Sequence, residues 1–583
     1  MPSDSSKELQ FRGTTLTYGA VPENGQETMN TRASHRARAA WYRIVAAGLV
    51  ACALSWTIQV HQAYAEGLSP SGSAATAPPP NIIFILVDDF SMNLLPYMLD
   101  LADPPHSHGL QDMVNTGTTF TNYFVSNSLC CPSRSSIFTG KYPHNTGVFT
   151  NVWAPNATPP LTDGGFGAFL HYGNQAHTFA LALQDRGKYH GKYVTSMLGK
   201  FLNQYLTDAN EPYNKNRAWT LNWGWDNWRV ADKGYLGFNY NLNENGAVNY
   251  YGAGDVNYMT HVLSSRAQDF ISAHTHRPFF LEVATFAPHH PYTPANADQQ
   301  KFPGLRLPVE VGNYQNPVNA PDWQIDIPAL LQTEVEQMNA DFRKRAQSVQ
   351  AIDKMISDIR TLLKKKGLDT NTYVFFSADN GYHMGEFNFL AGKMTPYEFD
   401  INVPLIVVGP GVPHQTLSAI AQNVDLAPTF TELAQLSEAL PTDPDGASLL
   451  PLLQGQKPSV WRKMALIEHH GPRPDDLSDP DNEQHERKSG ATNPPNYAAL
   501  RIMDVDSIVA TPVNAMYVEY EGRDEKGSPV VEPCYYDLTK DPYERINIYQ
   551  SLPQERRLEL QALLGNLRTC GHAGKPTCWT VQQ

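Results

Sequence analysis

Four short runs of apolar, β-branched or aromatic residues along the chain each stop abruptly at polar or charged residues. Runs of this kind are typical of strands buried on both faces of a parallel sheet. Because parallel α/β sheets gather their ligands at the carboxyl ends of the strands, four such endings predict one shared site. The runs are 81–87 before Asp88 and Asp89, 193–198 before Gly199 and Lys200, 278–286 before Ala287-Pro288-His289, and 373–378 before Asp379 and Asn380.

Helical patterns lie between these runs. The longest spans about 334–366, where apolar residues recur at three- and four-residue steps from Ala346 to Ile359. Alternating strands and helices predict a large α/β domain with a mixed, mostly parallel sheet flanked by helices, which we place at 81–455. Shorter alternating runs further along predict a smaller α+β domain with an antiparallel sheet at 456–583. Its expected strands are 463–468, 497–503, 507–510 and 515–520, followed by a helix at 553–567.

The first 65 residues have the layout of a secretory signal peptide. Four arginines between positions 32 and 43 precede an apolar run at 44–60, and Ala63-Tyr64-Ala65 matches a small-x-small cleavage signal. An uncut membrane anchor and lipidation at Cys52 are the alternatives. We expect an exported protein, periplasmic or secreted (or in a lysosomal-type compartment in a eukaryote), with no stable membrane insertion after cleavage.

Two further segments flank this predicted signal. Met29 stands just before the arginines, so residues 1–28 are a candidate non-native extension that arises from the choice of start site. Residues 66–80 are rich in Ser, Ala, Gly and Pro, a composition typical of a flexible linker.

Composition narrows the class of protein. The 583 residues are 41% hydrophobic, enough for a large core, which excludes a mainly disordered chain. The 44 Lys and Arg against 58 Asp and Glu give a net charge of −14, so nucleic acid is not an expected partner. The six cysteines are too few for a disulfide scaffold, and none has the Cys-x-x-Cys spacing of a zinc site. In an exported protein we expect one disulfide, between Cys570 and Cys578.

Two of the strand ends present only oxygen ligands. Asp88 and Asp89 follow one run, and Asp379 and Asn380 follow another. Hard cations such as calcium or magnesium prefer such ligands, whereas zinc favours nitrogen or sulfur. A lone Asp-Asp pair would equally suit a helix cap or a solvated turn, but the second strand end favours a metal site.

A cysteine pair opens the segment between these strand ends. Pro132 suits the first turn of a helix, so Cys130 is expected just before a helix N-terminus, where backbone donors and the dipole favour an anion. Arg134 and Lys141 add positive charge. Packing, a disulfide and a thiolate nucleophile all remain open for the cysteines from the residues alone.

The segment Cys130-Cys-Pro-Ser-Arg134, followed by Thr139-Gly-Lys141, resembles the signature of the type I sulfatases, members of the alkaline phosphatase superfamily. The likeness extends over about residues 80–550 and is closest to the N-acetylglucosamine-6-sulfatase branch. The shared segments of that branch are Gly-Lys-Tyr-Pro-His-Asn at 140–145, Gly-Trp-Asp-x-Trp at 224–228 and Tyr-Glu-Phe-Asp-Ile-x-Val-Pro-Leu at 397–405.

The resemblance implies a specific chemistry. Cys130 would be oxidised to formylglycine by a formylglycine-generating enzyme, and its hydrate would be the nucleophile. Calcium would be held by Asp88, Asp89, Asp379, Asn380 and the modified Cys130. The implied catalytic set is Cys130, Arg134, Lys141, Lys200, His289 and Lys393, and the implied substrate-binding set is Lys200, His289, His383 and Lys393. The family landmarks at 423–429 and 536–542 would be structural.

One departure from the family pattern matters. Many sulfatases read Gly-Lys-x-His where this chain has Gly199-Lys-Phe-Leu-Asn203, so the usual histidine is missing. His289 or His383 could act in its place. The aromatic cluster at 219–240 could line a sugar site or simply pack.

The expected activity is hydrolysis of a sulfate monoester, either an aryl sulfate or a sulfated sugar such as 6-sulfated N-acetylglucosamine. Two other functions remain open. One is a phosphonate or phosphoester hydrolase of the same superfamily, and the other is a sugar-binding pseudoenzyme in which Cys130 is never converted.

Overall fold

The computed structural model describes residues 79–583, apart from segments 102–107, 157–161, 185–192, 208–222, 309–314, 437–442, 471–493, 505–512, 524–525 and 573–574. The predicted signal peptide at 1–65, its extension at 1–28, most of the linker at 66–80 and the expected strand at 507–510 lie outside the described residues. The described residues belong to one compact unit, Pro78–Gln583.

The four apolar runs form adjacent, parallel strands of a ten-stranded sheet. In spatial order they are β9 (Thr372–Ala378), β1 (Asn81–Val87), β8 (Phe279–Ala284) and β4 (Val194–Lys200). Their residues are buried on both faces, which explains why the runs are continuously apolar. The carboxyl ends of all four strands therefore meet at one edge of the sheet.

Shorter strands extend the sheet on both sides of this parallel centre. β10 and β6 run antiparallel to their neighbours, so the sheet is mixed but mostly parallel, as predicted. The flanking strands are β10 (Leu405–Val408), β2 (Thr118–Phe120) and β11 (Gln415–Leu417) beyond β9, and β5 (Asn227–Ala231), β6 (Tyr240–Glu244) and β7 (Ala247–Tyr251) beyond β4. A separate pair joins β3 (Tyr123–Phe124) to β12 (Ala421–Gln422).

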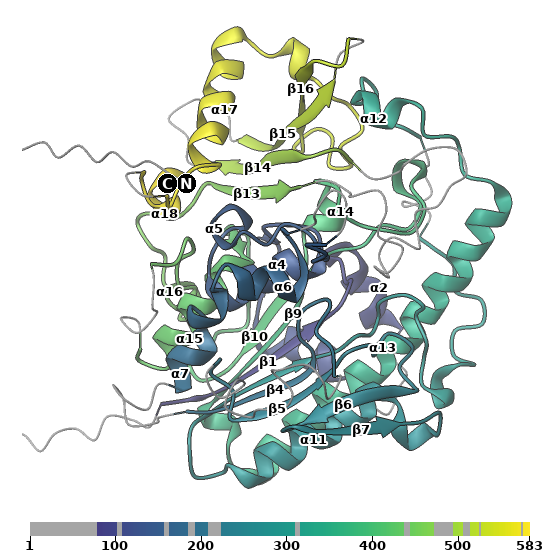
Figure 1. The fold of residues 1–583 in the computed structure, drawn as a ribbon, viewed down its shortest axis with the longest axis vertical. Coiled ribbons are helices and arrows are strands. Elements are labelled where there is room, and N and C mark those ends of the chain that lie inside the picture. The colour runs from purple at the N-terminus through teal and green to yellow at the C-terminus, as the bar shows by residue number, and fades with distance from the viewer. Residues whose placement is uncertain are drawn as a thin grey trace, which may run out of the picture. The chain divides into compact units, whose positions relative to one another are not determined.

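Helices cover both faces of the large sheet (Figure 1). Helices α4 (Cys130–Thr139), α7 (Phe179–Gln184) and α15 (Leu426–Leu433) pack together on one face, where the Phe430 ring lies 5.4 Å from Phe84 and 5.2 Å from Phe280. Helices α3 (Gly109–Thr116), α11 (Met259–Ala273) and α13 (Gln332–Lys366) pack together on the other. The helix expected at 334–366 is thus confirmed.

The remaining helices are short. The α-helices are α2 (Leu95–Asp100), α5 (Pro143–Thr146), α6 (Gly165–His171), α12 (Asp322–Ile325), α14 (Glu398–Ile401), α16 (Leu450–Leu453) and α18 (Cys578–Gln582). The 3-10 helices are η1 (Met92–Leu94), η2 (Asn174–Ala176), η3 (Asp255–Asn257), η4 (Asn296–Asp298), η5 (Asp369–Asn371), η6 (Glu386–Asn388), η7 (Asn423–Asp425) and η8 (Tyr549–Ser551). None of the helices in the described part of the chain has both the length and the apolar content needed to cross a bilayer.

The C-terminal region forms the predicted antiparallel sheet, with α17 (Gln554–Leu567) packed against it (Figure 1). The strand order is β13 (Met464–His469), β14 (Tyr497–Asp504), β15 (Val513–Arg523) and β16 (Pro529–Asp537). Strand β16 was not predicted, because two prolines and a mixed sequence hide its periodicity. The expected disulfide between Cys570 and Cys578 is confirmed, while the boundary at 455/456 stays a prediction.

Candidate active site

Backbone hydrogen bonds join the ends of β1 and β9, where the paired carboxylates lie. The amide of Asp379 donates to the Val87 carbonyl (3.1 Å), and the amide of Phe90 donates to the Asn380 carbonyl (2.9 Å). Asp89 has a φ of 61°, a conformation that is rare for a residue other than glycine. In an extended strand neighbouring side chains point to opposite faces, so this bend allows Asp88 and Asp89 to share one site.

Helix α4 brings the cysteine motif to this edge. Cys130 is the first residue of the helix, rather than the residue before it as expected, and Leu129 is the N-cap. Such a difference of one residue is common at helix ends. The Cys130 Sγ lies 3.4 Å from Asp88 Oδ1 and 3.0 Å from the Nζ of Lys393. The predicted nucleophile is therefore completely buried between a carboxylate and an ammonium group.

Three basic side chains pair with the three carboxylates of the site. Arg134 Nε donates to Asp379 Oδ2 (2.8 Å), Lys200 Nζ to Asp88 Oδ2 (2.6 Å), and Lys393 Nζ to Asp89 Oδ1 (2.7 Å). All six side chains are at most 3% exposed. Three negative and three positive charges leave this buried group with no net formal charge.

The electrostatics follow from this pairing. Burial alone would raise the pKa of Asp88, but the Lys200 ammonium and His289 outweigh it, so the pKa of Asp88 is lowered. Burial acts against the charge of Lys200, yet Asp88 and Cys130 hold its pKa well above the usual value. Burial and the neighbouring Asp88 raise the pKa of Asp379. Burial also raises the pKa of the Cys131 thiol to about 12, so Cys131 is a neutral packing residue.

The oxygen-rich group fits a hard divalent cation. Ligand atoms of Asp88, Asp89, Cys130 and His289 lie within 4.8 Å of one another. Asp89 Oδ2 and Asn380 Oδ1 are buried and accept no hydrogen bond from the described residues, so both oxygens keep lone pairs for a ligand. Buried oxygens without donors are costly unless an ion or a water satisfies them. The donor set is thus suited to calcium or magnesium.

His289 reaches the same cluster from the loop after β8. Its Nε2 lies 3.5 Å from Asp89 Oδ2, and its Nδ1 is 2.7 Å from the His290 carbonyl, to which it donates. The Tyr235 ring packs 4.7 Å from the His289 ring and 5.0 Å from the Lys200 ammonium. His289 therefore has a fixed orientation with Nε2 directed at the carboxylates.

A cavity of about 440 Å³ opens beside Lys200. Its wall includes Tyr235 and Phe286, together with Asp232 and Lys233 at the carboxyl end of β5. Of the aromatic cluster at 219–240, the tryptophans at 223, 225 and 228 pack in the core, whereas Tyr235 faces the cavity; position 219 lies outside the described residues. Volumes of 300–1,000 Å³ are typical of small-molecule sites.

Two of the predicted residues, Lys141 and His383, interact with groups outside the cluster of carboxylates and Cys130. Lys141 follows the end of α4, about 15 Å along the helix from Cys130, and its charge acts on His177 and Asp445. His383 is buried with its Nδ1 2.9 Å from Asp400 Oδ2, and its ring packs 5.0 Å from Phe389. The position of the missing family histidine is taken by Leu202, which lines the cavity together with Asn203.

Several residues that support the site were not identified from the sequence. Arg345 of α13 donates from Nη2 to the Asp89 carbonyl (2.5 Å) and stacks over the Tyr382 ring at 4.7 Å. Ser133 Oγ donates to the Asp379 carbonyl and accepts from Asn423 Nδ2, which gives the family landmark at 423–429 a structural role. For Arg345 a signal existed, since a charged residue interrupts the apolar stripe of a long helix.

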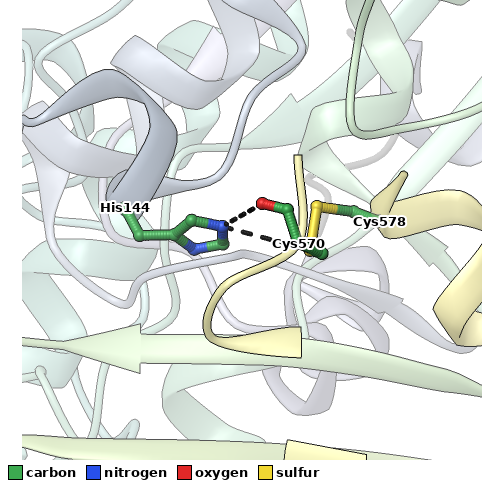
Figure 2. A group of neighbouring side chains, drawn as sticks. All are labelled: His144, Cys570 and Cys578. Atoms are coloured by element: carbon green, nitrogen blue, oxygen red, sulfur yellow. Dashed lines mark hydrogen bonds between the residues drawn. A yellow bond between two sulfur atoms is a disulfide. The ribbon is translucent and has the colours of Figure 1, made fainter. Parts of the chain in front are cut away.

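A second group of side chains lies where the C-terminal disulfide meets α5 (Figure 2). The His144 ring points towards the Cys570 carbonyl, 3.1 Å from Nε2, and its Nδ1 pairs with Glu468 at 2.7 Å. Both sulfurs are in the Cys570–Cys578 disulfide and are not available as thiolate ligands. This group is therefore a structural connection between α5 and the C-terminal sheet.

Comparison with known proteins agrees with this geometry. A model of the sulfatase family matches residues 80–436. The chain is 31% identical over 525 residues to N-acetylglucosamine-6-sulfatase of Homo sapiens, covering 87% of each protein. It is 27% identical over 570 residues to an arylsulfatase of Volvox carteri, covering 88% of this chain and 78% of that protein.

Solved structures show the same fold. A protein in complex with its substrate D-glucosamine-2-N,6-O-disulfate aligns with a TM-score of 0.61 and 22% identity, covering 84% of this chain and 98% of that one. A phosphonate monoester hydrolase from Silicibacter pomeroyi aligns with a TM-score of 0.56 and 19% identity, covering 85% and 96%. With its sheet, its strand-end cluster and its family match over most of the length, this chain belongs to the sulfatase family of enzymes.

Proposed function

We propose that the protein hydrolyses the sulfate monoester of a sugar, with 6-sulfated N-acetylglucosamine as the first substrate to test. The observation that carries this proposal is the position of Cys130. It occupies the first turn of α4 and contacts both Asp88 and Lys393 within a buried, charge-balanced cluster. The identity to N-acetylglucosamine-6-sulfatase supports the choice of sugar.

The residues of the cluster fit two groups that complete the site. Asp88, Asp89, Asp379, Asn380 and the modified side chain at position 130 would hold calcium, which supplies positive charge for oxygens of the ester. Formylglycine made from Cys130 supplies, as its hydrate, a nucleophilic hydroxyl and a second hydroxyl that allows the aldehyde to be restored. A formylglycine-generating enzyme is accordingly the maturation partner.

The basic residues bind and orient the sulfuryl group. The ammonium group of Lys200 pairs with Asp88 and that of Lys393 with Asp89, and the Arg134 guanidinium holds Asp379 from α4. In a dry, low-dielectric site, fixed charges stabilise a developing negative charge far more than they do in water. Both oxygens of Asp379 already accept hydrogen bonds, so this residue anchors the site.

His289 is suited to protonate the departing alkoxide. Its Nδ1 donates to the His290 carbonyl, so the exchangeable proton is at Nε2, beside Asp89 Oδ2. A sugar alkoxide is a poor leaving group, and general acid catalysis typically contributes 10²–10⁴-fold to such steps. We therefore assign the protonation of the leaving group to His289.

The cavity beside Lys200 is the proposed site of the sugar. Tyr235 offers an aromatic face, while Asn203, Asp232 and Lys233 supply polar groups for hydroxyl and amide substituents. Such a combination of one aromatic wall and a few polar groups suits a carbohydrate. The disulfide and the signal-like segment at 1–65 support maturation in an exporting, oxidising pathway.

The test combines mass spectrometry with sulfate release. The protein is co-expressed with a formylglycine-generating enzyme and assayed on N-acetylglucosamine 6-sulfate, 4-nitrophenyl sulfate and phenyl phosphonate esters. We expect the peptide containing Cys130 to be about 18 Da lighter and sulfate release to exceed phosphonate cleavage. Cys130→Ser should lower turnover about 10³-fold or more.

Each other outcome has a defined meaning. Parental activity in Cys130→Ser would refute the proposed nucleophile. Faster cleavage of the phosphonate ester than of the sulfate esters would identify the protein as a phosphonate hydrolase. An unmodified Cys130 with sugar binding but no turnover would identify a binding protein.

A further inference from the structure

We infer that Tyr497, from the C-terminal sheet, is a positioning residue for the active-site Lys393. This inference rests on the proposed function, because it assigns Lys393 to the binding of the sulfuryl group. It gives the C-terminal sheet a part in the chemistry, although every proposed catalytic and metal-binding residue lies before residue 394.

The loop that carries Lys393 has a strained backbone. Met394, the next residue, has a φ of 79°, in the left-handed region that residues with a side chain seldom adopt. Such conformations persist only where the surrounding structure holds them in place, and they occur often at functional sites. The position of the Lys393 ammonium, 2.7 Å from Asp89 and 3.0 Å from Cys130, depends on this conformation.

Hydrogen bonds from two directions hold the strained residue. On one side, Asp400 Oδ2 accepts from the Thr395 amide (3.0 Å) and hydroxyl (2.6 Å), and is itself 2.9 Å from His383 Nδ1. His383 is therefore linked to the lysine loop through Asp400. On the other side, the Met394 amide donates to the Ser128 carbonyl (3.2 Å).

Tyr497 completes the second side. Its hydroxyl donates to the Met394 carbonyl at 3.0 Å and lies 3.4 Å from Ser128 Oγ, which in turn donates to the Thr395 carbonyl at 3.0 Å. Ser128 is only two residues before Cys130, so one hydroxyl contacts both the lysine loop and the segment that leads into α4. Tyr497 is 3% exposed, and its ring packs between His469 and Tyr520 of the same sheet.

The chain offers a matched control in the neighbouring tyrosine. Tyr520 pairs directly with Tyr497 across β14 and β15, is completely buried, and its hydroxyl has no hydrogen-bond partner among the described residues. Tyr520→Phe therefore removes a hydroxyl from the same packing environment without touching the Lys393 loop.

The test is a double-mutant cycle on the converted enzyme with a sulfate ester as substrate. Tyr497→Phe should lower kcat/KM by about tenfold or more, since small misplacements of catalytic groups are costly, whereas Tyr520→Phe should stay within about twofold. In a Lys393→Ala background, Tyr497→Phe should have no further effect, because it acts through Lys393. The Tm should fall by no more than about 4 °C.

Two results would overturn the inference. The first is a kcat/KM of Tyr497→Phe within about twofold of wild type. The second is an equal fold loss of kcat/KM from Tyr497→Phe in the wild-type and Lys393→Ala backgrounds, which would indicate a purely structural role. A crystal structure of Tyr497→Phe is the second readout: we expect the Lys393 ammonium to leave hydrogen-bond distance of both Asp89 and Cys130. A Lys393 that does not move in this structure contradicts the inference, whether or not the wild type is active. Absence of sulfate ester turnover by the wild type, in contrast, would count against the proposed function alone.

Discussion

Glu282 gives the sharpest prediction about stability, because it is a carboxyl group in the centre of the large sheet. It lies on β8, next to Phe84 of β1 and Met197 of β4, and is completely buried. Neither of its carboxylate oxygens has a hydrogen-bond partner in the described part of the chain. Burial raises the pKa of Glu282 from 4.5 to about 8, against a smaller lowering by Arg134.

The sign of the effect follows from proton binding. In the unfolded chain the group ionises near pH 4.5, whereas in the folded protein it keeps its proton until about pH 8. The folded state therefore binds the extra proton in this window, and the free energy of unfolding decreases as the pH rises through it. At about 1.4 kcal/mol per pH unit, the difference between 4.5 and about 8 corresponds to about 5 kcal/mol.

Two substitutions isolate this contribution. Glu282→Gln and Glu282→Met both remove the titration, so the stability of each variant relative to wild type should increase by about 5 kcal/mol between pH 4.5 and pH 9. The glutamine leaves a buried amide that costs about 1–3 kcal/mol at every pH, so it should be the less stable of the two. Urea unfolding over the pH range measures both quantities. Parallel stability curves for wild type and both variants would refute the reasoning.

Three more predictions concern the remaining features. Glu468 raises the pKa of the partly desolvated His144 from 6.5 to about 9, so this ion pair stabilises the folded protein below about pH 6.5 and its contribution is lost as the pH rises through 9. In urea unfolding, the stability deficit of His144→Gln relative to wild type should shrink by about 3 kcal/mol over that range, and a constant deficit would contradict this. In thermal melts, calcium at 100 times its Kd should increase the stability of the protein by about 3 kcal/mol, and Asp89→Asn should abolish this increase. An equal increase in the variant would place the ion at another site. Replacing Cys570 and Cys578 by serine should lower the free energy of unfolding by about 2–3 kcal/mol, measured without reductant. An unchanged free energy of unfolding would show that other contacts constrain the short loop.

The strand ends could be predicted from the sequence because their signal is local. Each run is continuously apolar and stops at polar residues, and parallel strands expose their carboxyl ends at one edge. The contacts of Asp89 with Asp379 and Asn380 follow from those two facts. Their oxygen-only side chains predicted a metal site from the residues, whereas the role of Cys130 came from the resemblance, since the residues alone left packing, a disulfide and a thiolate nucleophile open.

The partners of the supporting residues could not be predicted, because they are distant in the chain. Arg345 contacts a carbonyl 256 positions away, and Tyr497 contacts one 103 positions away. No periodicity encodes such pairs. For Lys141, which the resemblance places in the catalytic set, the ten-residue helix α4 separates the side chain from Cys130, and its catalytic role stays a prediction.

The charge balance of the site determines which substitutions can report on its chemistry. Asp88, Asp89 and Asp379 are neutralised in the interior by Lys200, Lys393 and Arg134, and removing one partner of a buried ion pair typically costs 3–5 kcal/mol. Loss of activity on replacing any of the six therefore includes a contribution from lost stability, so the Tm of each such variant has to be measured beside its activity. Cys130→Ser and Tyr497→Phe remove no charge and almost no volume. Because they leave the balance intact, these two substitutions separate the chemistry of the site from its stability.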